Sequence, residues 1–207
     1  MHPIERLRYV ARSQGVPADV LVPESAAALM AFRHDPAGMV AACRRIVDRQ
    51  VDCGQLWWLC SRILCGLDVL EEARAAVEEF TSDPTPDRLA EAVDGLGDEP
   101  VPAIVEARAC GATSAVVDGR AVRRLEAASP EDPVWLVAPV GTVLPEATFE
   151  VLCSRWSDLR EESASPAGLV ELSAFSAVVR PKGILPPERA TRRADCPVAP
   201  ELFHRPG

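Results

Sequence analysis

The pattern of hydrophobic residues is most distinctive between Pro133 and Pro145. Residues 134–137 (VWLV) form an unbroken apolar run with β-branched and aromatic members, bounded by proline and too short for a helix. Such a run predicts a strand that is buried on both faces of a sheet. Gly141 then predicts a turn, and Pro145 is expected at the first position of a helix. A strand, a glycine-containing turn and a helix make half of a βαβ unit, in which ligands bind in the loops that follow the strands.

Apolar residues recur at helical spacing through the first part of the chain, which predicts a helical domain over residues 1–93. Two helix starts carry capping signals: Asp35 stands before Pro36, and Asp68 stands three residues before Glu71 as in a capping box. Proline predicts two more starts, one at Pro23 and one at Thr85-Pro86.

A change of pattern follows at residues 94–100 (DGLGDEP), whose glycines, acids and proline predict a linker. Beyond it, short apolar runs alternate with helical patterns, which predicts an α/β domain over residues 101–207. Residues 157–168 predict a mobile polar loop, and the proline-rich tail from Pro181 is expected to wrap the surface. The remaining elements predicted here are strands at 103–105, 114–117, 169–172 and 177–179 and helices over 120–128 and 145–156.

Composition excludes several classes of protein. Apolar residues make up 48% of the chain, which is enough to bury a core, and the formal net charge of −9 argues against binding to nucleic acid. The N-terminus lacks the apolar core of a signal peptide, and no window approaches the roughly 20 apolar residues of a membrane span. We therefore expect a cytoplasmic protein that is not bound to a membrane, with its seven cysteines mostly reduced.

The cysteines and tryptophans favour packing over chemistry. Cys53, Cys60 and Cys65 show no C-x-x-C spacing, so small hydrophobic core residues are a better interpretation than zinc ligands. We predict no metal and no cofactor. Adjacent residues on a helix point about 100° apart, so at least one of Trp57 and Trp58 is expected in the core, and the other could line an interface.

No glycine-rich phosphate loop is present. Residues 110–114 (CGATS) follow a predicted strand, and their N–H groups and hydroxyls could hold an anion. A plain connecting loop is the alternative interpretation of these residues.

Three segments in order resemble a known family: VEARACGATSAVVDGRAV (105–122), PVWLVAPVGTVLP (133–145) and DCPVAPELF (195–203). They are similar to the regulatory (alpha, beta and delta) subunits of translation initiation factor 2B, methylthioribose-1-phosphate isomerase and ribose-1,5-bisphosphate isomerase. The chain looks like a shortened and divergent actinobacterial member. This resemblance implies a fold of the α/β class, in which an N-terminal helical domain precedes a reduced Rossmann-like parallel sheet with flanking helices.

The same segments depart from the isomerases at the positions that carry their chemistry. Where the isomerases have an acid–base Asp, this chain has Arg108, and where they have an Asn-Lys pair it has residues 117–120 (VDGR). No cysteine matches the catalytic one of the isomerases. The resemblance therefore implies a retained framework with an altered catalytic set.

We expect a ligand to lie at the C-terminal ends of the central strands. Glu106 is the candidate catalytic base there, and Arg120 offers the bidentate geometry that suits phosphate. The alternative for Arg120 is an ion pair with Glu106 or Asp118, with the glycines merely turning the chain. The other candidate ligand-binding residues are Arg108, Gly111, Thr113, Ser114 and Gly141.

Two hypotheses follow from the resemblance and these residues. The first is a non-catalytic binding or regulatory protein, a homodimer that binds a small phosphorylated metabolite such as a sugar phosphate or a nucleotide-like molecule. The second is a sugar-phosphate aldose–ketose isomerase that uses Glu106 as base and Arg108 or Arg120 as phosphate clamp. The altered catalytic set favours the first.

Overall fold

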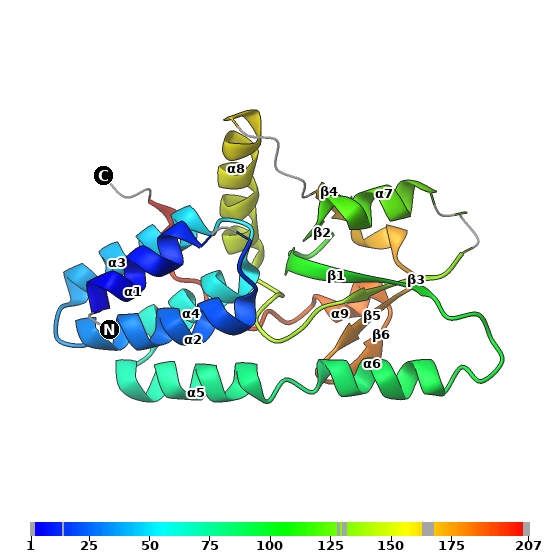
Figure 1. Ribbon diagram of the computed structural model, residues 1–207, viewed down its shortest axis with the longest axis horizontal. Helices are drawn as coiled ribbons and strands as arrows, with labels where there is room; N and C mark the ends of the chain where they lie inside the picture. The colour runs from blue at the N-terminus through cyan, green and yellow to red at the C-terminus, as the bar shows by residue number, and fades with distance from the viewer. Residues whose placement is uncertain (1–2, 14, 128, 130–131, 163–167, 205–207) are drawn as a thin grey trace.

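The computed structural model describes residues 3–13, 15–127, 129, 132–162 and 168–204. The first part of the chain is a bundle of helices, and the second is an open sheet with helices around it (Figure 1). The chain is therefore of the mixed α/β class with its helical region first, as the sequence predicts. The helical region contains α1 (Pro3–Arg12), α2 (Ala18–Leu29), η1 (Met30–Phe32), α3 (Pro36–Arg49), α4 (Gly54–Cys65), α5 (Val69–Thr81) and α6 (Thr85–Asp94).

Capping accounts for several of these helix starts. The Asp35 carboxylate accepts a hydrogen bond from the Gly38 N–H at 2.9 Å, and the Asp68 carboxylate accepts from the N–H groups of residues 70 and 71. The prediction that Pro23 starts a helix is wrong, because α2 begins at Ala18 and contains Pro23. Burial of the apolar face of α2 keeps the helix continuous although proline removes one backbone hydrogen bond.

The sheet has six strands in the order β4-β2-β1-β3-β5-β6. β3 lies between β1 and β5 and is parallel to both, so the prediction of a central parallel strand at residues 134–137 is confirmed. The prediction of a parallel sheet holds only for these three strands, because β2, β4 and β6 pair in the antiparallel sense. The bounds are β1 (Ala103–Cys110), β2 (Ser114–Val117), β3 (Val134–Val137), β4 (Gly168–Glu171), β5 (Ala177–Arg180) and β6 (Gly183–Leu185).

Two hairpins produce the antiparallel pairs. β1 runs to Cys110, five residues beyond the predicted end at Val105, and only three residues separate it from β2. A parallel crossover needs a dozen residues or more, so such a connection can only make a hairpin. β5 and β6 are likewise joined by two residues, after which Gly183 adopts a φ of +121°, which suits glycine alone.

The remaining helices surround the sheet. α7 (Gly119–Ala127) packs beside β4, α6 packs against β5 and β6, and α8 (Glu146–Glu162) stands between the sheet and the helical region (Figure 1). α8 includes residues 157–162, so the prediction of a loop there is wrong for those residues, while residues 163–167 lie outside the described part of the chain. The tail forms β6, α9 (Pro187–Ala190) and η3 (Pro200–Phe203), and the prediction that it wraps the surface is wrong for Ala190, Ala199 and Leu202, which are buried.

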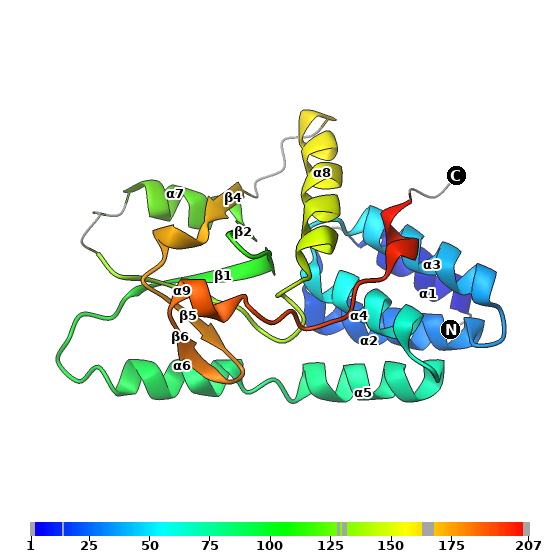
Figure 2. The same cartoon turned by 180° about the vertical axis from the view of Figure 1, so that it is seen from behind.

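The end of the chain returns to the helical region, where it runs beside α3 (Figure 2). Leu202 is fully buried in the same cluster as Trp57 and Trp58, neither of which is exposed. The Arg44 side chain donates to the Glu201 carbonyl at 2.6 Å, and Arg155 donates to the Leu202 carbonyl at 2.6 Å. The core of the helical region is thus completed by residues from the end of the chain.

Candidate functional site

The residues at 111–114 form the turn of the β1–β2 hairpin and its first strand position. The Gly111 N–H donates to the Ser114 carbonyl at 2.9 Å, and the Thr113 carbonyl accepts from Leu172 N–H at 2.8 Å. The Ala112 N–H donates to the Glu146 carboxylate at 2.7 Å. A carboxylate of the chain itself therefore takes an N–H group that a bound anion would use. A Cβ at Gly111 would lie 2.3 Å from the Phe149 ring, so this glycine permits close packing on α8.

Gly141 lies beside the end of β1 in the loop after β3. The Cys110 N–H donates to the Thr142 carbonyl at 2.7 Å, which joins this loop to the hairpin. Gly141 has a φ of +81°, and a Cβ there would approach the Trp58 ring to 2.9 Å. Its conformation thus allows the loop to pack on α4.

Arg120 lies apart from these loops, in the first turn of α7. Because β2 runs antiparallel to β1, the end of β2 is opposite Ala107 and not beside the hairpin turn. Arg120 is exposed, and among the described residues no ion pair joins it to Glu106 or Asp118. The Asp118 carboxylate instead accepts from the Ala121 N–H at 2.7 Å and caps α7.

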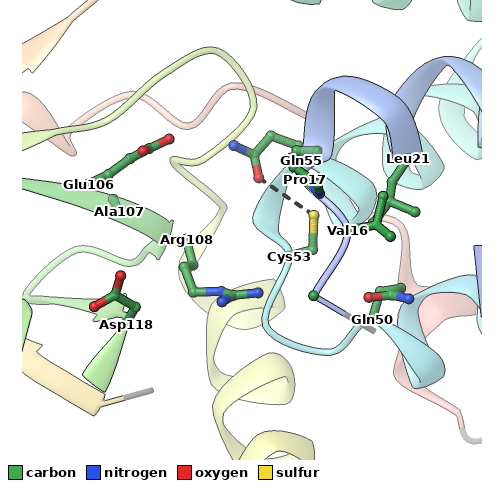
Figure 3. A pocket seen from close by; sticks show the side chains of 12 residues that line it. Val16, Pro17, Leu21, Gln50, Cys53, Gln55, Glu106, Ala107, Arg108 and Asp118 are labelled. Carbon is green, nitrogen blue, oxygen red and sulfur yellow. Dashed lines mark hydrogen bonds between the residues drawn. The ribbon is translucent and has the colours of Figure 1, made fainter. Parts of the chain in front are cut away.

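Glu106 and Arg108 share a pocket of about 240 Å³ between the helical region and β1, which we call the junction pocket (Figure 3). Both side chains line the pocket, although the register of β1 with β2 shifts between Ala107 and Ala109, next to Arg108. The segment between α1 and α2, the start of α4, β1 and the end of β2 supply the walls. The lining residues are Gly15, Val16, Pro17, Ala18, Leu21, Gln50, Cys53, Gln55, Glu106, Ala107, Arg108 and Asp118.

The charges in the junction pocket are mostly negative. Arg108 pairs with Asp52 at 3.1 Å, while among the described residues Glu106 has no hydrogen-bond or ion-pair partner. The thiol of Cys53 donates to the Gln55 side-chain oxygen at 3.6 Å, and burial raises the pKa of Cys53 to about 11. The thiol is therefore protonated at neutral pH and is a poor nucleophile.

A second pocket, of about 560 Å³, is lined by five cationic side chains, and we call it the basic cleft. It lies at the C-terminal end of β5, which Arg180 closes, and Val140 from the loop after β3 also lines it. In an open α/β sheet, this edge of the parallel strands is where ligands bind. The lining residues are Glu79, Val140, Arg180, Pro181, Lys182, Leu185, Arg189, Ala190, Arg192, Arg193, Ala194 and Asp195.

Arg180 organises the basic cleft. Its guanidinium donates to the carbonyls of Ala190 and Arg193 and forms an ion pair with Asp195. Asp195 in turn accepts from the Val143 N–H at 3.1 Å, and its carbonyl accepts from the Trp58 indole at 3.1 Å. Burial raises the pKa of the Asp195 carboxyl, and the Arg180 charge opposes that rise. The loop that carries two of the cations is thus fixed to β5, to the Gly141 loop and to α4.

The other cations of the basic cleft are not neutralised. Among the described residues, no ion pair joins Lys182, Arg189, Arg192 or Arg193 to a carboxylate. Of the two acids in the lining, Glu79 is paired with Arg62 and Asp195 with Arg180. The cleft therefore carries a local positive charge on a chain whose formal net charge is −9.

Sequence reasoning missed the basic cleft although a local signal exists. Residues 180–193 contain five cationic side chains and a single acid, the reverse of the balance of the whole chain. The prolines of this segment predict a surface wrap, and the excess of cations is a separate signal in the same residues. A local excess of arginine and lysine in an acidic protein predicts an anion site without any motif.

The cysteines, the potential metal ligands and the lengths of the helices also bear on the predictions. Cys53 and Cys60 are buried, which confirms their interpretation as core residues, whereas that interpretation is wrong for Cys65, which is exposed at the last position of α4. In the part of the chain that the structure describes, no group of three or more His, Cys, Asp or Glu side chains is placed to hold a metal ion. No described helix combines the length and the apolar character needed to cross a membrane.

No protein-family model matches this chain, and no curated protein matches it either. The resemblance to initiation factor 2B subunits and sugar-phosphate isomerases therefore rests on the three sequence segments alone.

Proposed function

We propose that the protein is a non-catalytic binding or regulatory protein whose ligand is a small phosphorylated metabolite held in the basic cleft. The observation that carries this proposal is the convergence of four cationic side chains without carboxylate partners on a cleft of about 560 Å³. Arginine donors match phosphate oxygens in geometry and in charge. The volume is in the ordinary range for small-molecule sites, and the apolar residues Val140 and Leu185 offer contact to the uncharged part of a ligand.

The chemistry of the cleft supports binding more than catalysis. Its two carboxylates are engaged by arginines, so neither is available as a base. The cleft also contains no cysteine, serine or threonine in its lining that would act as nucleophile. The chain also differs from the isomerases that it resembles at their catalytic positions, which agrees with a binding function. From the same resemblance we also propose that the protein is a cytoplasmic homodimer with a reduced Rossmann-like sheet. Light scattering at micromolar protein concentration would test whether it is a dimer.

The direct test is calorimetric titration with ribose 5-phosphate, with uncharged ribose as the ligand control. We expect the doubly substituted variant Arg192→Ala/Arg193→Ala to bind about tenfold more weakly, since each lost charge pair is partly exposed. The matched control is Arg120→Ala, which removes an exposed arginine outside the cleft and should leave the affinity unchanged. Equal affinity of the double variant and the wild type, or a loss in Arg120→Ala alone, would reject the cleft as the site.

An aldose–ketose isomerase remains the second candidate because Glu106 has no partner among the described residues and shares a pocket with Arg108. The Asp52 carboxylate beside Arg108 and the carboxylate of Asp118 in the same pocket would repel a phosphate, and Arg120 does not line this pocket, so that base lacks a phosphate clamp. Turnover of aldose 1-phosphates that is lost on Glu106→Gln would establish isomerisation and overturn the non-catalytic assignment.

A further inference from the structure

The junction pocket is lined by an amide nitrogen that has no protein partner among the described residues. Gln55 is 7% exposed, and its side-chain oxygen accepts from the Cys53 thiol. Among the described residues, nothing accepts a hydrogen bond from its amide nitrogen, Nε2. In Figure 3 this amide extends from α4 toward the β1 side of the pocket. This nitrogen is not among the fully buried polar atoms that lack a partner, so it is open to the pocket and can donate to a ligand or to water.

The opposite side of the pocket presents two acceptors. Glu106 projects from β1 with no partner among the described residues, and Asp118 uses one carboxylate oxygen, Oδ1, to cap α7. These carboxylates lie on the same side of the pocket in Figure 3. A group that donates several hydrogen bonds and carries positive charge is therefore favoured there.

Arg108 supplies further donors to the pocket. It pairs with Asp52 through Nε, at 3.1 Å, which leaves the two terminal nitrogens of its guanidinium for another acceptor. Its side chain is 40% exposed and extends toward Cys53 in Figure 3. The donors of Gln55 and Arg108 thus face a pocket whose other side holds the carboxylates, and a ligand that spans it needs an acceptor at one end and a cation at the other.

We propose that the junction pocket binds a free amino acid, with its ammonium group on Glu106 and Asp118 and its carboxylate on Gln55 and Arg108. The volume of about 240 Å³ accommodates a molecule of this size. Val16, Pro17 and Leu21 line the remaining wall and face an apolar side chain of the ligand. This site is separate from the basic cleft and shares no lining residue with it.

The charge pattern distinguishes an amino acid from a phosphorylated ligand. The lining contains two carboxylates and one arginine that already has a carboxylate partner. A phosphate would meet repulsion from Glu106 and Asp118, whereas a zwitterion matches both signs. The two pockets therefore select different chemical classes.

The test is calorimetric titration of the full chain with each of the standard L-amino acids at millimolar concentration. For the amino acid that binds best, the matching amine and the matching carboxylic acid, each lacking one charge, should bind about tenfold more weakly or not at all. Tight binding of either analogue alone would overturn the zwitterion assignment, and so would the absence of binding by every amino acid.

Two variants assign the contacts. Glu106→Gln keeps the shape of an exposed side chain but removes its charge, and Gln55→Met keeps the length of the chain but removes the donor; each should weaken binding about tenfold. Glu150→Gln, at an exposed position of α8 outside the pocket, is the matched control and should bind as the wild type does. Because Glu106 is exposed, its variant tests the proposal even if Gln55→Met fails to fold. Unchanged affinity in Glu106→Gln would overturn the proposal, whatever ribose 5-phosphate does at the basic cleft.

Discussion

Arg180 is the residue whose removal tests the structure of the basic cleft most directly. Replacement by Met keeps much of the side-chain length and removes three polar contacts at once, those to Asp195 and to the carbonyls of Ala190 and Arg193. Asp195 remains largely buried, since the Arg180 and Asp195 side chains are 11% and 17% exposed in the pair. The variant therefore leaves a buried carboxylate without its cation.

The expected cost is large for a single substitution. Removing one partner of a buried ion pair typically lowers the free energy of unfolding by about 3 to 5 kcal/mol, whereas an exposed pair contributes about 1 kcal/mol or less. The low exposure of both side chains places Arg180→Met in the first range. Urea unfolding at neutral pH measures this loss, and Arg123→Met, at an exposed position of α7, is the control with an expected change within about 0.5 kcal/mol.

The pH dependence of the same variant follows from Asp195. Burial already raises the pKa of this carboxyl, and Arg180 is the charge that lowers it, so the pKa rises further in the variant. A carboxyl whose pKa is higher in the folded than in the unfolded chain lowers the free energy of unfolding at pH values above its folded-state pKa. This loss disappears as the pH falls through the folded-state pKa, because the carboxyl becomes protonated. Arg180→Met should therefore recover part of its lost stability, relative to the wild type, on mild acidification.

A second substitution distinguishes a stranded charge from a general packing defect. Adding Asp195→Asn to Arg180→Met removes the unpaired carboxylate, so the double variant should be more stable at neutral pH than Arg180→Met alone. A loss below about 1 kcal/mol in Arg180→Met, or a double variant less stable than the single one, would refute the reasoning.

Two further predictions concern stability. Gly54→Ala should lower the free energy of unfolding by about 1 to 3 kcal/mol, because a Cβ there would lie 2.7 Å from the Arg108 carbonyl oxygen, whereas helix propensity alone would make alanine stabilising. Urea unfolding gives the sign, and Gly95→Ala is the control, because the atom nearest to a Cβ there is 3.4 Å away, an ordinary contact distance. Stability should also fall as pH rises above about 9, by up to about 1.4 kcal/mol per pH unit for each thiol that ionises only in the unfolded chain. Urea unfolding between pH 8 and 10 measures this loss, and an unchanged stability would contradict it. The thiols concerned, whose pKa burial raises to about 11 or 12, are those of Cys53, Cys110, Cys153 and Cys196.

Local signals explain what the sequence predicts well. The caps at Asp35 and Asp68 and the apolar run at residues 134–137 each specify their element through neighbours in the chain, and the structure contains all three elements. The same reasoning fails at Pro23, where burial of a helix face outweighs one missing hydrogen bond. Local propensity therefore predicts the presence of an element more securely than its start.

The sheet topology escaped prediction because it depends on where one strand ends. With β1 ending at Val105, eight residues would separate it from Ser114, but the strand continues through Glu106 and Arg108 to Cys110. Polar residues at alternate positions are typical of a strand with one accessible face, and here that face lines the junction pocket. Because β1 extends to Cys110, its connection to β2 is a hairpin. The hairpin places Gly111 at one end of β2 and Arg120 beyond the other end.

The candidate sites differ in how far a sequence can predict them. The cations of the basic cleft lie within fourteen residues, from 180 to 193, so charge counting is enough to find them. The junction pocket brings Gln55 together with Glu106 and Asp118, which are far apart in the sequence and meet only because α4 docks on β1. Nothing in the local pattern at Gln55 indicates that its amide nitrogen would lack a partner. Such a site becomes visible only after the packing of the helices on the sheet is known.

Both pockets take walls from the helical region and from the sheet: Gln55 and Glu79 come from helices, while Glu106 and Arg180 come from strands. A ligand in either one therefore stabilises the docked arrangement, by about 2.7 kcal/mol when its concentration is 100 times its Kd. By the same linkage, a substitution that weakens the docking of the helical region on the sheet lowers the affinity for both ligands, whereas the loss of one ligand contact lowers the affinity for that ligand only. Gly54→Ala disturbs the docking of α4 on β1 at a position outside either lining. We expect Gly54→Ala to reduce the affinity for both ligands. Arg192→Ala/Arg193→Ala should reduce the affinity only for the ligand of the basic cleft, and Glu106→Gln only for the ligand of the junction pocket. This difference would distinguish effects of domain docking from effects of individual ligand contacts.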